Sequence, residues 1–83
     1  MAEDHATMQS SWSQVRESCK QVLKADPDRM AEIVAQWSAF VENNPSPWGY
    51  TLLGIFEQES GHFSNASAAF DKTHQIEPTY PTE

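Results

Sequence analysis

Apolar residues recur along this 83-residue chain at intervals of three and four, the spacing that places side chains on one face of an α-helix. Four such stripes occur, and no alternating pattern typical of β-strands competes with them. The third stripe differs from the others, because its apolar residues fall on nearly all sides of the predicted helix. Such a helix is usually buried on more than one face. The stripes cover residues 8–23, 30–41, 48–56 and 63–76.

Residues that start or stop helices set the boundaries between the stripes. Pro27 disfavours helical geometry at the preceding residue, so the first helix is expected to end at Asp26. Either Asp26 or Asp28 can cap the second helix, and Ser46 before a proline is a strong start signal for the third. Gly61 can adopt the positive φ that ends that helix. The pattern predicts an all-α fold in which four antiparallel helices form two stacked helical hairpins.

The chain is short enough for one domain. Residues 1–7 have no apolar periodicity, and we expect them to be a disordered N-terminus. Residues 8–78 are expected to form a single helical domain, followed by a C-terminal tail at 79–83. A chain of this length buries only about 60% of the surface that its unfolded form exposes, so its stability margin is small.

Charge and composition exclude several classes of function. The chain carries 12 acidic and 5 basic residues, giving a net charge of −7, which argues against binding nucleic acid or an anionic membrane. No run of about 18 apolar residues could span a bilayer, and the first residues lack the pattern of a signal peptide. The single cysteine, Cys19, fits a reducing compartment. We expect a soluble cytoplasmic protein.

Residues 47–78 contain small and aromatic residues in the order and spacing of one tetratricopeptide (TPR) repeat, a helical hairpin of ~34 residues that this stretch resembles. The small members would let the two helices approach closely. Phe63, Phe70 and Ile76 are expected to fill the width between this hairpin and its neighbour. The matching residues are Tyr50, Leu53, Gly54, Gly61, Phe63, Ala66, Phe70, Ile76 and Pro78.

Two positions depart from that repeat, because Glu57 stands in place of an aromatic residue and Thr73 in place of an alanine. Residues 11–45 resemble a second, degenerate repeat that lacks the Leu-Gly pair. The alternative for this half is an unrelated helical pair packed on the repeat. The residues that match in this half are Trp12, Val15, Cys19, Ile33, Trp37, Phe40 and Pro45. The resemblance implies a fold of two stacked TPR-like hairpins.

TPR domains bind other proteins, so the resemblance implies an adaptor or chaperone. Solenoids generally need three or more repeats, and at most two are present here. We therefore expect another chain, either an amphipathic helix or a second copy in a homo-oligomer, to cover the apolar surplus of the third helix. The expected protein-binding groove is lined by Trp48, Thr51, Ile55 and Gln58.

Other interpretations remain open at this point. The chain could be a structural self-assembly subunit with no separate ligand, or a regulatory domain that occludes an enzyme or a transcription factor. Two hairpins could also suffice alone, with the aromatic residues as ordinary core. A row of basic residues at four-residue steps forms a possible electrostatic interface for an acidic partner, and its alternative is a solvated helix face. These basic residues are Arg16, Lys20 and Lys24.

No catalytic, cofactor or metal site is expected. The histidines, His5, His62 and His74, lie apart and lack partners at metal-ligand spacing. Cys19 falls within an apolar stripe, where a small buried hydrophobe is the simplest interpretation. The three glycines are isolated, so no glycine-rich phosphate loop is present. The sequence thus predicts a non-enzymatic protein.

Overall fold

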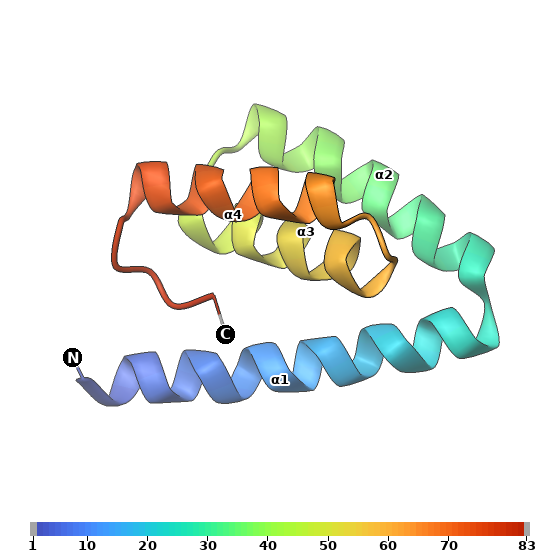
Figure 1. Cartoon of the computed structure of the whole chain (residues 1–83), viewed down its shortest axis with the longest axis horizontal. Helices are drawn as coiled ribbons and strands as arrows, with labels where there is room; N and C mark the ends of the chain where they lie inside the picture. Colours follow the sequence, from blue (N-terminus) through green and yellow to red (C-terminus); the bar gives the residue numbers. More distant parts are fainter. Residues whose placement is uncertain (1, 83) are drawn as a thin grey trace.

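The computed structural model describes residues 2–82, with side chains described from Trp12 onward, and contains four helices (Figure 1). No strand occurs within residues 2–82. The predicted all-α fold of four helices is therefore confirmed. The helices are α1 (Ala2–Ala25), α2 (Pro27–Asn43), α3 (Pro47–Glu59) and α4 (Phe63–Ile76).

Helix α1 begins earlier than the apolar pattern indicates. Its first residue is Ala2, so residues 2–7 are helical where the sequence predicts a disordered N-terminus, and Met1 lies outside the described residues. Alanine has the highest helix propensity, and Ala2 and Ala6 both lie in this segment. Hydrophobic periodicity detects a helix only through an apolar face, and these residues have none.

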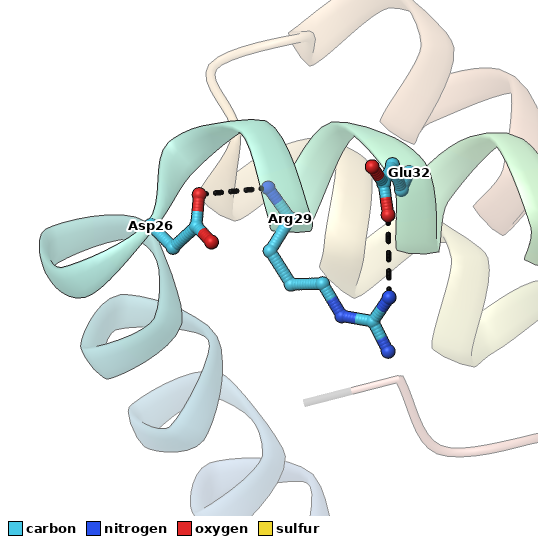
Figure 2. Close-up of polar contacts among 3 residues, drawn as sticks. All are labelled: Asp26, Arg29 and Glu32. Carbon is cyan, nitrogen blue, oxygen red and sulfur yellow. Dashed lines mark hydrogen bonds and ion pairs between the residues drawn. The ribbon is translucent and has the colours of Figure 1, made fainter.

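The turn between α1 and α2 is a single residue, Asp26 (Figure 2). Its Oδ1 atom accepts a hydrogen bond from the backbone N–H of Arg29 at 3.2 Å, so Asp26 rather than Asp28 caps α2. The Arg29 guanidinium pairs with Glu32 at 3.2 Å, but both side chains are more than half exposed. An exposed pair of this kind stabilises little. The cap and Pro27 at the first helical position therefore define this turn.

The other two turns also follow their sequence signals. Ser46 caps α3, because its hydroxyl accepts a hydrogen bond from the Gly49 N–H at 2.9 Å. Gly61 has a φ of 84°, the left-handed conformation that glycine adopts without a steric penalty. Its N–H donates to the Gln58 carbonyl at 3.1 Å and helps to satisfy the C-terminal end of α3. The turns at Asp26 and Gly61 join α1–α2 and α3–α4 into two hairpins, and the turn at Ser46 connects the two hairpins.

Helix α3 is the central element, because it packs against all three of the other helices. Its closest neighbour is α4. The ring of Phe70 lies directly over Gly54, where a Cβ atom would stand only 2.5 Å from the ring. Thr51 and Thr73 are completely buried at the same interface, with their hydroxyl oxygens 3.1 Å apart. The buried hydroxyl that Thr73 introduces in place of an alanine therefore has a hydrogen-bond partner across the hairpin.

Several of the residues matching the repeat lie where packing requires them, and two do not. Ala66 is buried against α3 and Phe70 is partly buried. Phe63 and Ile76, by contrast, are 68% and 48% exposed, so they do not fill the space toward the neighbouring hairpin. The reason is that α2 does not approach α4 closely; a groove separates them. The remaining matching residues lie in that groove (Tyr50, Leu53), at the surface (Gly61, Pro78) or in the α3–α4 contact (Gly54).

The core lies between α1, α2 and α3, and the residues after α4 close it. We call residues 77–82 the C-terminal segment; it turns back from α4 toward α1 (Figure 1). Tyr80 from this segment is buried, although the sequence indicates only a tail here. The buried cluster consists of Trp12, Cys19, Met30, Ile55 and Tyr80.

Substituting Gly54 tests the close approach of α3 and α4. Gly54→Ala is expected to lower the free energy of unfolding by roughly 1–3 kcal/mol, because the added methyl group overlaps the Phe70 ring. Urea denaturation monitored by circular dichroism measures the change. Combining Gly54→Ala with Phe70→Leu should destabilise by less than the sum of the two single substitutions. Strict additivity of the two would contradict the contact.

Candidate protein-binding surface

The four side chains predicted to line a groove on α3 do not form one open surface. Thr51 and Ile55 are 0% exposed, whereas Trp48 is 50% exposed and Gln58 is exposed. A partner cannot reach Thr51 or Ile55 in this structure. The predicted groove is therefore closed by the chain itself.

Different parts of the chain cover the two buried residues. The Thr51 hydroxyl faces α4 and donates a hydrogen bond to the Pro47 carbonyl at 2.8 Å. Ile55 belongs to the buried cluster together with Trp12 of α1 and Tyr80 of the C-terminal segment. The sequence pattern did not reveal this cover, because it comes from residues at the two ends of the chain.

The predicted basic row on α1 is only partly available to a partner. Arg16 donates to the Thr82 carbonyl at 3.0 Å and lies 3.5 Å from the Gln58 side-chain oxygen, so the chain itself uses its charge. Lys20 lies 3.9 Å from Glu17, and both side chains are more than half exposed. Lys24 is exposed near the end of α1. Arg16 is thus part of the fold, while Lys20 and Lys24 remain at the surface.

A different groove is open to solvent. It lies between α1, α2 and α3, and we call it the α1–α2–α3 groove. Its volume is about 520 Å³, and apolar side chains make up most of its lining. Sequence reasoning missed it, since each wall belongs to a different apolar stripe and the predicted groove was confined to the third helix. The lining residues are Gln14, Val15, Ser18, Cys19, Val22, Met30, Ile33, Leu52 and Phe56.

An aromatic cluster adjoins this groove, and it consists of Trp37, Phe40, Trp48 and Phe56. Trp37 stacks on Phe40 at a centroid distance of 4.9 Å, and it meets Trp48 and Phe56 edge-on. The Trp37 indole N–H donates to the Gly49 carbonyl at 2.9 Å, which fixes the central ring. Phe40 and Trp48 are each about half exposed. Because Phe56 also lines the groove, the two apolar surfaces are continuous.

The groove between α2 and α4 is smaller and more polar. Its volume is about 380 Å³, and its lining includes Glu42, Glu57 and Lys72. Glu57 is buried, and its carboxylate lies 3.2 Å from Nδ1 of His62, which is more than half exposed. Glu57, which stands where the TPR pattern has an aromatic residue, is thus paired with His62. Its lining mixes apolar side chains such as Val41 and Leu53 with these charged groups, so it suits the apolar face of a helical ligand less well than the α1–α2–α3 groove does.

Among the described side chains, no three His, Cys, Asp or Glu residues come together in a way that could hold a metal ion. Burial raises the pKa of the Cys19 thiol to about 11, and Glu59 adds to the rise while Arg16 opposes it. Burial also raises the pKa of Tyr80, with a further contribution from Glu77. The Cys19 thiol, with its raised pKa, therefore stays protonated at neutral pH, unlike a nucleophilic cysteine.

Comparisons with known proteins return nothing for this chain: no family model, curated protein or solved structure matches it. Among the described helices, none has the length and apolar content needed to cross a membrane. The interpretation of the surface therefore depends on its own geometry.

The raised pKa of Cys19 predicts how this thiol reacts with alkylating reagents. At pH 7.5, Cys19 should react with iodoacetamide at least about 100-fold more slowly than an ordinary protein thiol. Its rate should continue to rise as the pH increases toward 11, because the thiolate forms only there. The control is Cys19→Ala combined with Ser18→Cys, which places a thiol at an exposed neighbouring position. Equal rates for the two thiols at pH 7.5 would contradict the burial of Cys19.

Proposed function

We propose that this chain is a non-enzymatic protein-interaction module, an adaptor or chaperone, that accepts the apolar face of a partner's amphipathic helix in the α1–α2–α3 groove. The observation that carries the proposal is the groove itself, with about 520 Å³ between three helices and a largely apolar lining. Helix-in-groove recognition uses a surface of this kind.

The aromatic cluster gives the groove a place for binding energy. Phe40 and Trp48 are each about half exposed, and covering apolar surface contributes about 25 cal/mol per Å². Aromatic residues are also enriched among the anchors of protein interfaces. The ring of Trp37 is already held by its hydrogen bond and by its neighbours, so little conformational entropy is lost when a partner binds.

Charge favours a basic partner. The chain has a net charge of −7, and Arg29 and Lys72 are its only basic residues after Lys24. Arg29 is paired with Glu32 in the structure. A partner helix with Lys or Arg beside its apolar face would be attracted to the net negative charge of the whole chain, and the attraction would weaken as the salt concentration rises.

A second copy of the chain is the other candidate occupant, as in a homo-oligomer or a structural self-assembly subunit. The exposed bases Lys20 and Lys24 support it, because they could meet the acidic surface of another copy. The equal net charges of two copies oppose it, and Arg16 already contacts the C-terminal segment. We therefore rank self-assembly second.

The resemblance of residues 47–78 to a TPR repeat supports the same class of function, since such repeats bind proteins. A regulatory role, in which the chain occludes an enzyme or a transcription factor, would use the same groove with a different partner. A reducing compartment such as the cytoplasm is the proposed location, because Cys19 is a buried free thiol.

A model helix tests the groove directly. The ligand is a fluorescent amphipathic peptide of about 14 residues, built from Leu on one face and Lys on the other, which spans ~21 Å as a helix. We expect the peptide to bind, and Ile33→Glu to weaken binding at least about tenfold, because it places a charge in the apolar groove. Fluorescence anisotropy measures the affinity.

The matched control is Gln36→Glu, which adds the same charge at an exposed position of α2 and should leave the affinity nearly unchanged. A peptide with Glu in place of Lys should bind more weakly than the Lys peptide. If Ile33→Glu and Gln36→Glu bind the Lys peptide equally, the attraction is only electrostatic and the groove proposal fails. Light scattering of the chain without peptide tests the second candidate, the homo-oligomer. That candidate requires the chain to form a dimer and Ile33→Glu to weaken the dimer.

A further inference from the structure

The C-terminal segment is held on the helices through its backbone. Three successive carbonyl groups each face a side-chain nitrogen from α1 or α4. The contacts are His74 Nε2 with the Tyr80 carbonyl (3.1 Å), Trp12 Nε1 with the Pro81 carbonyl (3.1 Å) and Arg16 Nη2 with the Thr82 carbonyl (3.0 Å). A carbonyl oxygen can only accept, so His74 donates through Nε2.

Contacts of this kind recognise the main chain rather than a particular sequence. The Tyr80 N–H donates to the Glu77 carbonyl at 3.1 Å, so residues 77–80 form a turn that leads into these three carbonyl groups. Tyr80 supplies the selective contact, because its side chain is only 9% exposed within the cluster that includes Trp12 and Ile55. Pro81 follows it and has no N–H, so its partial burial leaves no backbone donor unpaired. Pro78 lies in the turn, where its fixed φ limits the conformations of the unbound segment.

We propose that the surface formed by Trp12, Arg16 and His74, with the Tyr80 pocket, is a peptide-binding site occupied by the chain's own C-terminal segment. The site accepts a segment with an aromatic–proline pair from another chain when its own segment is displaced. The tethered segment competes at an effective concentration in the millimolar range. The intact chain is therefore autoinhibited toward such peptides.

This site is reached from another side than the α1–α2–α3 groove, although Cys19 and Met30 of the groove lining belong to the same buried cluster as Tyr80. The groove is lined on α1 by Val15, Ser18 and Val22, among others, and none of its lining residues contacts the backbone of the C-terminal segment through a hydrogen bond. Trp12 and Arg16 point to the C-terminal segment from the same helix. The two proposals are tested with different peptides, an amphipathic helix and a Tyr-Pro segment, so the failure of one can be told from the failure of the other.

The test uses the full chain carrying Tyr80→Ala and a fluorescent peptide with the sequence of residues 77–82, Glu-Pro-Thr-Tyr-Pro-Thr. Anisotropy should show saturable binding to Tyr80→Ala, at least about tenfold tighter than to the wild-type chain. The reason is that the chain's own C-terminal segment competes less well once it has lost the Tyr80 side chain. Thr79→Ala, at an exposed neighbouring position, is the matched control and should behave like the wild-type chain. A peptide with Ala in place of Tyr should bind at least about tenfold more weakly.

If Tyr80→Ala lowers the helix content, the same peptide provides a second measurement. Added peptide should restore the helical circular dichroism signal and raise the melting temperature, because a ligand that binds only the folded state stabilises it. The Ala peptide should do neither. The proposal is overturned if the Tyr peptide neither binds Tyr80→Ala nor stabilises it, or if the two peptides act equally.

Discussion

Helix α3 carries apolar side chains on nearly all its sides, and the need to cover them from every direction is the constraint on which the rest of the structure depends. Helix α4 covers one side through the contact of Phe70 with Gly54. Helix α1 and the C-terminal segment cover Ile55, which is completely buried. Helix α2 and the aromatic cluster cover the remaining side only in part, since Trp48 is half exposed. The incomplete cover produces the surface to which we assign the function.

The sequence predicted those features that depend on neighbouring residues. The four helices, the cap at Ser46 and the positive φ of Gly61 follow from local geometry, and the structure contains all of them. The start of α1 was not predictable from periodicity, because a helix without an apolar face leaves no such pattern. The close approach at Gly54 was predictable from the small residue itself, since only glycine leaves room for the Phe70 ring.

The surface could not be predicted in the same way. The bond between Trp12 and Pro81 joins residues 69 positions apart, and no local pattern indicates it. The apolar surplus of the third helix predicts a groove at Ile55 and a tail at residues 79–83; in the structure, Tyr80 lies in the cluster that buries Ile55. The α1–α2–α3 groove arises from the angle between three helices, which the apolar stripes do not specify. Long-range packing therefore decides which apolar residues are core and which are surface.

Native-state hydrogen exchange of the α3 amides tests the central claim, that the chain buries Thr51 and Ile55 of α3 without a partner, most directly. If the claim holds, the amides near Thr51 and Ile55 in the isolated chain exchange more slowly than those of the other helices, at rates set by global unfolding. Exchange of these amides as fast as that of the frayed helix ends, with protection appearing only after a partner is added, would contradict it.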